Sequence, residues 1–341
     1  MKEYLYKPAT YHDDKGLFSS ELKYIGQNGP LPASHSDLIP EAEGFHEALT
    51  KAWTSKGHEL TGDVHNGTMR GHWKCTNSIY NGKRSSLWVH LVGKDNVTVF
   101  SEANSKRLII EAGKAVGVEV IGPDGNDYTF RAKREVVVAS GVYESPKLLM
   151  LSGVGSKAAL SQFGIETIVD SAHVGQNLLD HPILLHVFRL KDGYGLDNHL
   201  LRAGLQKDAA ALAYRWKNKS PLTSGLLELV GLPRINERLE KIPEYVAAKA
   251  ANSGLEPFGP GGQPHFEIDF VPMFSDAFQW HIPAPPQGEY MTVIVDLLRP
   301  LSKSGTVELN STNPLEQPKI NINFFADDLD IVAMREGVQM S

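Results

Sequence analysis

Between residues 97 and 137 the sequence consists of short apolar runs separated by turn residues. Turn residues cluster at 112–114 and at 123–126. Three valines alternate with other residues between these turns: Val116, Val118 and Val120. Alternation with a period of two is typical of a half-buried strand. The pattern therefore predicts a β-meander over residues 97–137, which opens with a strand at 97–100.

A second kind of strand is indicated by the unbroken apolar run EVVVAS at residues 135–140. Such a run suits a strand that is buried on both faces, as in a parallel sheet. Without sheet neighbours on either side, it would expose apolar edges. The helix that follows is expected to begin with Ser145 as its N-cap and Pro146 at its first position, where a missing N–H costs nothing.

The remaining periodic segments are helices and antiparallel strands. Helical spacing predicts three longer helices, at residues 41–57, 199–215 and 234–252. Alternating patterns predict antiparallel strands, at residues 265–272, 290–298 and 306–310. We place a domain change near residue 182, which gives domains at 1–182 and 183–341. The segment before residue 95 can join either of them.

Composition and charge narrow the class of protein. The 341 residues are 41% hydrophobic and 22% charged, which excludes a wholly disordered or collagen-like chain. The net charge is −6 without a basic block, so we expect no nucleic-acid partner. No apolar stretch is long enough to span a membrane, and the N-terminus lacks the apolar core of a signal peptide. We therefore expect no membrane association and favour a cytoplasmic location; the oligomeric state cannot be read.

Most motifs that carry chemistry are absent. The sequence contains no GxGxxG, P-loop or GxSxG pattern, and its 13 histidines lack the spacing of metal ligands, so no metal site is expected. The single cysteine, Cys75, excludes an internal disulfide. The glycine-rich turn after the run at 135–140 fits two interpretations: a ligand site at a strand end, or an ordinary connection between a strand and a helix.

One longer string is more specific. Residues 141–155 read GVYESPKLLMLSGVG, in which Ser-Pro, two aliphatic residues and Ser-Gly-aliphatic-Gly stand at fixed spacing. This string resembles the second signature of the glucose–methanol–choline (GMC) oxidoreductase family, with Val142 in place of the usual small residue. Other segments are similar to the same family: GKRSS at 82–86, the meander at 96–120, VGQNLLDHP at 174–182 and residues 297–325. The similarity is strongest to fungal alcohol oxidases and dehydrogenases.

The resemblance implies an α/β fold: an incomplete, Rossmann-like FAD-binding domain with a β-meander, followed by an α+β substrate domain built on an antiparallel sheet. It also implies an FAD-dependent enzyme that oxidises the CH–OH group of a small alcohol by hydride transfer to the flavin. Relatives carry an N-terminal βαβ unit and a catalytic His in a later segment. We expect this His beyond Ser341, so no catalytic residue is assigned, and we expect the isolated chain to be inactive and without stable FAD.

The resemblance suggests two groups of site residues. Four residues are expected near the cofactor: Ser105, Ala139, Ser140 and Gly141. Three residues are expected to line the substrate pocket: Phe270, Pro272 and Phe274. Aromatic residues with a period of two are more often core residues than pocket residues, so the core interpretation stays open. His181, in the LLDHP motif, is interpreted as structural.

Two other functions remain open at this point. Some proteins with this flavin fold are lyases or cyclases, and the residues that decide between these reactions lie outside the matched segments. The chain could also be a degenerate, non-catalytic paralogue that acts as a binding protein or scaffold. Fold analogy alone does not choose among these reactions.

Overall fold

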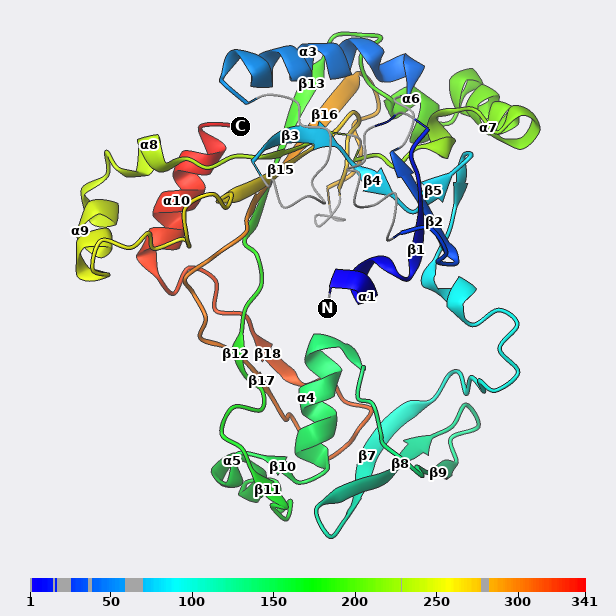
Figure 1. The fold of residues 1–341 in the computed structure, drawn as a ribbon, viewed down its shortest axis with the longest axis vertical. Coiled ribbons are helices and arrows are strands. Elements are labelled where there is room, and N and C mark those ends of the chain that lie inside the picture. The colour runs from blue at the N-terminus through cyan, green and yellow to red at the C-terminus, as the bar shows by residue number, and fades with distance from the viewer. Residues whose placement is uncertain are drawn as a thin grey trace. The chain divides into compact units, whose positions relative to one another are not determined.

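The chain folds into two compact units (Figure 1). Unit 1 comprises residues 1–94, 181–299 and 331–341, and unit 2 comprises residues 95–180 and 300–330. The structure is a computed structural model that describes residues 2–14, 16, 26–35, 39–58, 70–227, 229–276 and 282–341. Each unit is described separately below.

The two expected domains were continuous in sequence, whereas unit 1 consists of three segments and unit 2 of two. The change near residue 182 lies next to the boundary between residues 180 and 181. Residues 1–94, however, belong with residues 181–299 to unit 1. The physical reason is strand pairing, because Gly71–Lys74 is hydrogen-bonded to Leu229–Leu232 in one sheet. A division into 1–182 and 183–341 would cut through that sheet.

Unit 1 is built on a five-stranded sheet in the order β13-β16-β15-β14-β3. Its strands are β3 (Gly71–Lys74), β13 (Ile183–Leu190), β14 (Leu229–Leu232), β15 (Phe266–Val271) and β16 (Glu289–Leu297). All neighbouring pairs are antiparallel, which confirms the strands expected at 265–272 and 290–298. One face of the two central strands is wholly apolar and buried: Phe266, Ile268, Phe270, Val293, Val295 and Leu297.

Helix α3 (Glu43–Ser55) packs on this apolar face and confirms the helix expected at 41–57 (Figure 1). The Trp53 indole occupies the space above Gly231 of β14, where any side chain would collide with the ring. Its ring centroid lies 6.0 Å from that of Phe270 in an edge-to-face arrangement. The missing side chain at Gly231 therefore leaves the space that the Trp53 ring, the largest side chain of the helix, fills.

Two buried carboxylates attach the loop after β13 to the sheet. Glu289 accepts N–H bonds from Gly193, Tyr194 and Gly195, at 2.6–3.0 Å. Asp197, which is fully buried, accepts the N–H groups of Phe274 and Tyr290 at 3.0 and 2.8 Å. Charge-assisted bonds of this kind satisfy backbone groups that would otherwise be buried without partners.

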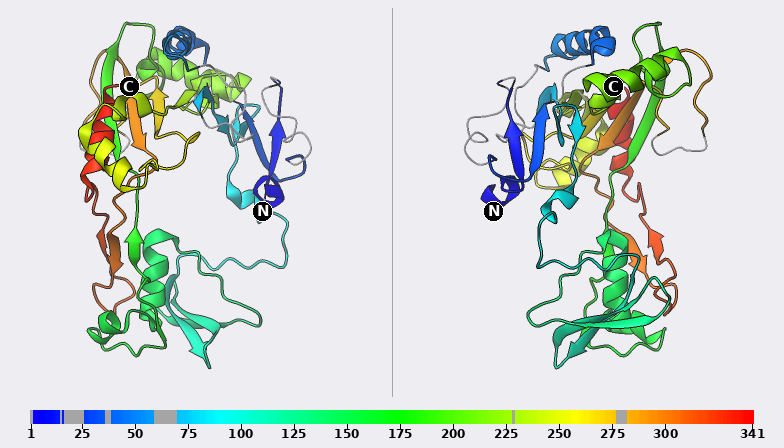
Figure 2. Two further views of the ribbon diagram at one scale, coloured as in Figure 1. Left: turned by 60° about the vertical axis from the view of Figure 1, so that its left-hand side comes forward. Right: turned by 90° about the vertical axis from the view of Figure 1, so that its right-hand side faces the viewer.

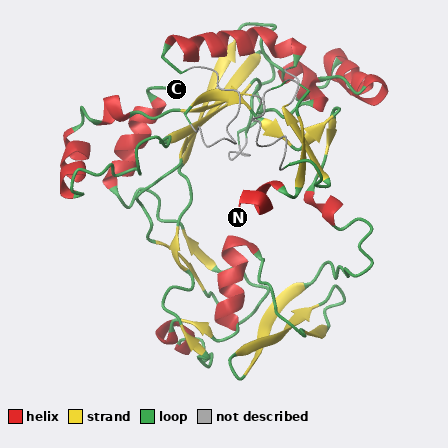
Figure 3. Cartoon of the chain, viewed as in Figure 1, coloured by secondary structure: helices red, strands yellow, loops and turns green. Residues whose placement is uncertain are grey.

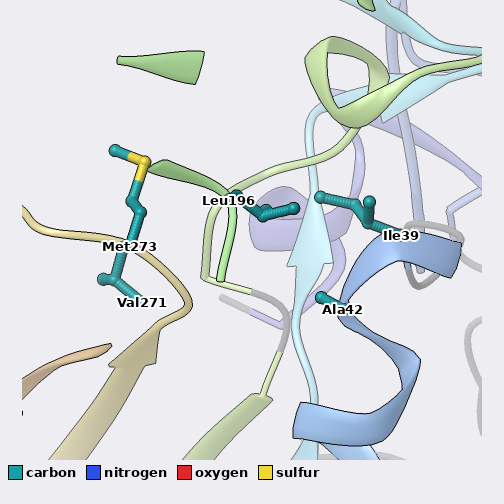
Figure 4. Packing of buried hydrophobic residues seen from close by; sticks show 5 residues of the cluster. All are labelled: Ile39, Ala42, Leu196, Val271 and Met273. Carbon is teal, nitrogen blue, oxygen red and sulfur yellow. The ribbon is translucent and has the colours of Figure 1, made fainter. Parts of the chain in front are cut away.

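The loop held in this way contributes to a second apolar cluster. Figure 4 shows its five buried members, with Leu196 pointing toward Ile39 and Ala42: Ile39, Ala42, Leu196, Val271 and Met273. Val271 belongs to the central strand β15, so the cluster covers the sheet on the face opposite α3. Both faces of the sheet are therefore packed, as a stable sheet of this size requires.

Two helices predicted as continuous are broken. The segment expected at 199–215 forms α6 (Asp197–Leu200) and α7 (Leu205–Lys217), separated at Gly204. The segment expected at 234–252 forms α8 (Asn236–Leu239) and α9 (Pro243–Ala251). Pro243 has no N–H to continue the first helix but fits the first position of the next one.

Shorter elements complete unit 1. They are α1 (Lys2–Tyr6), β1 (Ala9–His12), β2 (Leu31–His35), a 3-10 turn at Pro40–Ala42, β4 (Thr76–Asn77), β5 (Ile79–Tyr80), β6 (Lys83–Arg84), and 3-10 turns at Leu87–His90 and Pro221–Thr223. The last helix, α10 (Asp328–Val338), begins in unit 2 and ends in unit 1.

Unit 2 contains the β-meander that the sequence predicts. Its strands β7 (Asn104–Glu111), β8 (Lys114–Ile121) and β9 (Asp127–Arg131) pair in that order. Helix α4 (Gly141–Leu151) lies beside β7 in Figures 1 and 2, and the Leu108 N–H donates to the Ser152 hydroxyl at its end. The other elements are β10 (Val154–Gly155), α5 (Lys157–Ser161), β11 (Val169–Asp170), β12 (Gln176–Leu178), β17 (Gly305–Glu308) and β18 (Lys319–Asn321).

Two predicted strands of unit 2 are wrong. Residues 97–100 and 135–139 are loop (Figure 3) and pair with none of the strands that the structure describes. Val137 is 77% exposed, although the run around it was expected to be buried on both faces. An apolar run becomes a strand only where a neighbour satisfies its backbone, and no described segment offers these residues an edge.

The start of α4 also differs from its prediction. The helix begins at Gly141, directly after Ser140, so Pro146 lies inside it and not at its first position. Gly141 has a φ of +87°, a conformation that glycine adopts without strain. This left-handed residue turns the chain into the helix several residues earlier than Ser145.

The contact between Trp53 and Gly231 can be tested by substitution. Gly231→Ala places a methyl group against the indole, which must shift or force the helix away from the sheet. We expect the free energy of unfolding in urea to fall by about 1–3 kcal/mol. Gly261→Ala is the matched control, since a methyl group there meets no atom within 4 Å. Equal stability of the two variants would show that the indole is not seated on Gly231.

Candidate functional site

The central strand of the unit 1 sheet carries an aspartate in the middle of an apolar row. Strand register aligns five residues across the sheet on the face opposite α3: Trp73, Val230, Asp269, Ile294 and Leu185. Asp269 is the one acidic member of this row, and it is only 8% exposed. Carboxylates are almost never buried unless they are paired, so this position requires an explanation.

Asp269 lacks the partners that other buried carboxylates of unit 1 have. Its Oδ1 atom is buried and accepts no hydrogen bond. Burial, together with the charges of Glu267 and Asp296, raises the pKa of the Asp269 carboxyl to about 7. The side chain is therefore neutral and able to donate a proton below about pH 7.

The next row along the sheet is acidic. Glu267 of β15 stands directly opposite Asp296 of β16. Burial, followed by the charge of Asp296, raises the pKa of Glu267. Asp296 in turn contacts the His181 Nδ1 atom at 3.2 Å, which agrees with a structural role for this histidine at the start of β13. Asp269 thus lies between an acidic row and the apolar cluster around Val271.

A buried histidine lies at the start of the same strand. His265 is fully buried, and its Nδ1 atom accepts the Ile235 N–H at 3.3 Å. Burial lowers its pKa to about 4, so the ring is neutral near pH 7. Because Nδ1 accepts a backbone N–H, we assign His265 to the connection between β15 and the loop after β14.

The residues expected to line a substrate pocket are core residues in this structure. Phe270 is 4% exposed and packs edge-on against Trp53, on the face opposite Asp269. Phe274 is 7% exposed and packs against Tyr290, with ring centroids 6.3 Å apart. Pro272 is buried, and its carbonyl accepts the Leu196 N–H. Their surroundings favour the core interpretation that the sequence left open.

The residues expected near the cofactor all lie in unit 2 and are exposed. Ser105 lies on β7, an edge strand of the meander, and Ala139, Ser140 and Gly141 lead into α4, which contacts β7. The Ser140 side chain makes no capping bond, and a Cβ atom at Gly141 would meet nothing within 4 Å. The start of α4 is therefore not capped by the Ser140 side chain, and helix N-termini favour anionic groups such as a phosphate.

The cavity described here does not involve the residues predicted for the cofactor or substrate site. A cavity of about 690 Å³ in unit 1 is lined by residues of β1, β2 and β5 and by the end of α7, and by no predicted site residue. Among the described residues, no group of three or more His, Cys, Asp or Glu side chains could hold a metal ion. In the same part of the chain, no helix is long and apolar enough to cross a membrane.

Sequence analysis missed Asp269, although a signal was present. Glu267 and Asp269 alternate with the core residues of HFEIDFVP, so both acids share one face of a strand that is otherwise buried. The pattern shows which residues share a face. It does not show that neighbouring strands place Val230 and Ile294 on either side of Asp269.

The raised pKa of Asp269 predicts how stability depends on pH. The ordinary pKa of an aspartate is 3.8, and in the folded protein that of Asp269 is about 7. The folded state therefore binds the proton more tightly, and this stabilisation is complete below about pH 4 and lost as the pH rises toward 7. We expect Asp269→Asn to gain up to roughly 4 kcal/mol relative to the unaltered protein between these pH values, in urea unfolding experiments.

The control for this measurement is Asp208→Asn on the exposed surface of α7. Its stability curve should run parallel to that of the unaltered protein. His265 contributes with the opposite sign, since its lowered pKa removes stability as the pH falls from 6.5 toward about 4. That contribution is common to all three proteins and cancels in the comparison. A curve for Asp269→Asn that parallels the control would contradict a raised pKa.

Comparisons with family profiles and with known proteins point to the same family. Two profiles described as GMC oxidoreductase match the chain, one at residues 22–183 and one at residues 300–341. A glucose methanol choline oxidoreductase of Aspergillus terreus is 26% identical over 333 residues, covering 94% of this chain and 50% of that protein. Human mitochondrial choline dehydrogenase is 28% identical over 324 residues, covering 94% of this chain and 49% of that protein.

Solved structures include a much more similar protein. A formate oxidase crystal structure superposes with a TM-score of 0.95 and 54% sequence identity, covering 99% of this chain and 59% of that one. A formate oxidase of Aspergillus oryzae RIB40, studied for the effect of a mutation on FAD modification, gives a TM-score of 0.94 at 54% identity. The chain spans about half the length of the curated relatives it matches.

The resemblance read from residues 141–155 is thus confirmed by independent matches near both ends of the chain. The α/β class, with a β-meander and an antiparallel sheet, is confirmed by the superposition. From these matches it follows that the chain belongs to the GMC oxidoreductase family, whose members are FAD-dependent oxidoreductases.

Proposed function

We propose that the protein containing this chain is an FAD-dependent oxidase that uses formate as its electron donor. The observation that carries the proposal is the 54% identity to formate oxidase over 99% of this chain. Identity to the choline dehydrogenases and the Aspergillus terreus relative is much lower, at 26–29%. Formate would lose a hydride and become carbon dioxide, and molecular oxygen would be reduced to hydrogen peroxide.

FAD, when bound, would supply the hydride acceptor and the route of electrons to oxygen. We propose that the start of α4 contributes to its binding. The N–H groups there would hold a phosphate or another polar group, and Gly141 would allow the ligand to approach the backbone closely. Ser105 on the neighbouring strand β7 would contribute its exposed backbone or hydroxyl group.

We propose that the sheet of unit 1 contributes residues that bind the electron donor. Its face opposite α3 combines an apolar row with the buried carboxyl group of Asp269 and, in the next row, Glu267 and Asp296. A dry, largely apolar wall with few polar groups is the usual lining of a small-molecule site. Phe270, Pro272 and Phe274 would support this wall from within the core and not touch the donor.

The reaction can be tested on the purified protein with its flavin bound. Under anaerobic conditions, formate is expected to bleach the visible absorbance of the oxidised flavin, and air is expected to restore it with release of hydrogen peroxide. A panel of primary alcohols serves as the comparison. Bleaching by an alcohol but not by formate would replace formate with an alcohol donor. Bleaching by neither would favour a lyase, cyclase or non-catalytic function.

The proposed cofactor contact at Gly141 has a matched control. Gly141→Ala adds a methyl group that meets no atom of the chain but would stand in the path of the ligand. We expect a several-fold fall in the ratio of flavin to protein in the purified variant. Gly125→Ala has a similar φ, +79° against +87°, and equally open surroundings in the same unit, so both variants carry similar backbone strain. An equal flavin content in both would remove Gly141 from the cofactor site.

A further inference from the structure

Unit 1 contains a cavity of about 690 Å³ that the proposed function does not use. Its walls come from the ends of β1 and β2, the 3-10 turn at Pro40–Ala42, β5 with the turn that follows it, and the end of α7. Figure 1 shows these strands and α7 on the same side of unit 1. A cavity of this volume lies within the range of small-molecule sites, so its lining can indicate which kind of ligand fits.

Hydrogen bonds between separate elements hold the walls of this cavity in place. The Ser34 hydroxyl of β2 donates to the Ile79 carbonyl of β5 at 2.6 Å. The Asn218 side chain, directly after α7, donates to the Asn81 carbonyl in the turn after β5. A side chain at Gly82 in that turn would collide with Asn218, so the two walls are in close contact. The cavity is therefore formed before a ligand arrives, which lowers the cost of binding.

Part of the lining is flat and apolar. His12 of β1 and Tyr80 of β5 are stacked, with ring centroids 3.5 Å apart and ring planes inclined by 9°. Ile39, Pro40 and Ile79 add aliphatic surface to the same cavity. Such groups suit the hydrocarbon part of a ligand, whereas its polar groups must be recognised by other side chains.

Charged side chains of both signs line the cavity without partners. Asp14 follows β1 and Glu41 lies in the 3-10 turn, whereas Lys217 ends α7 and Lys219 lies two residues further along the chain. None of these four side chains forms an ion pair or a hydrogen bond with another residue that the structure describes. A third acid in the lining, Asp13, already has an interaction of its own. Two unpaired charges of each sign therefore line one cavity.

This balance of charges restricts the kind of ligand. A simple anion would be attracted by the lysines and repelled by the acids, and a simple cation would meet the reverse. A metal ion is also unsuitable, because the described part of the chain contains no group of three or more His, Cys, Asp or Glu side chains that could hold one. A molecule with one positive and one negative group can form charge-assisted hydrogen bonds with both pairs of side chains.

We propose that this cavity binds a small zwitterion, a molecule with an amine and a carboxylate joined by a short carbon chain, which is the chemical class of the amino acids. Lys217 and Lys219 hold the carboxylate, and Asp14 and Glu41 hold the ammonium group. The carbon chain lies against the apolar part of the lining, near Tyr80. The inference is independent of the proposed formate oxidation, because none of the residues proposed for the cofactor or the electron donor lines this cavity.

Titration calorimetry on the flavin-loaded protein measures the binding of three zwitterions of increasing length: glycine, β-alanine and γ-aminobutyrate. Each is compared with its analogues that carry only one of the two charges, such as butyrate and propylamine for γ-aminobutyrate. We expect the preferred zwitterion to bind at least about tenfold more tightly than either analogue, since each analogue lacks one charge-assisted interaction. The four charged side chains are exposed, so added salt should weaken this binding. Glucose is included as a neutral polar compound.

A double variant and a matched control locate the binding site. Lys217→Gln with Lys219→Gln removes the positive pair, so the preferred zwitterion should then bind no more tightly than its amine analogue. Lys207→Gln with Arg215→Gln removes the same number of charges from α7 outside the cavity lining and should bind as the unaltered protein does. All four substituted side chains are exposed, so both variants should fold, and their melting temperatures are recorded as a check.

Selective zwitterion binding that the Lys217 and Lys219 variant loses and the control keeps would support the proposal. It would be overturned if none of the three zwitterions binds, or if glucose or an analogue with a single charge binds as tightly as they do. Equal zwitterion affinity in the variant and the control would place the ligand elsewhere and overturn the site as well. Formate oxidation enters none of these results, so the proposed reaction stands or falls separately.

Discussion

The register of the central strand β15 against β14 and β16 is the constraint on which the rest of unit 1 depends. It places Phe266, Ile268 and Phe270 under α3 and leaves Glu267 and Asp269 on the other face. A slip of one residue would exchange the two faces completely, putting two carboxyl groups beneath the Trp53 indole. Burial of the phenylalanines against one face is therefore what holds the acidic groups on the other.

Carboxyl groups have two distinct uses in this chain. Most of the buried ones hold backbone: Glu289 and Asp197 fix the loop after β13, and Asp330 accepts the Leu301 and Ser302 N–H groups in unit 2. Each of these accepts hydrogen bonds from the backbone donors that surround it. Asp269 differs in that apolar side chains flank it on the neighbouring strands, and this difference in neighbours, not in residue type, accompanies its raised pKa.

The sequence predicted the local patterns well and the long-range partners poorly. The helix at 41–57, the meander at 104–131 and the strands around 270 and 294 were predictable because each shows its own period. The run at 135–140 was mispredicted because an apolar run does not reveal whether a neighbouring strand exists. Asp269 was missed for a related reason, since its character comes from Val230 and Ile294, which lie 39 and 25 residues away in sequence. Ser105 and residues 139–141 came from family resemblance and remain a proposal.

The pairing of β3 with β14 has a consequence for folding during synthesis, because β3 is made long before its partner strand. Residue 74 leaves the ribosome 155 residues before residue 229, which at roughly 5–20 residues per second leaves β3 without its sheet for about 8–30 seconds. An unpaired apolar strand is a template for aggregation during such an interval. Strand β3 is only four residues long, GHWK, and ends in a lysine. It therefore offers other nascent chains little backbone to pair with before β14 has been synthesised.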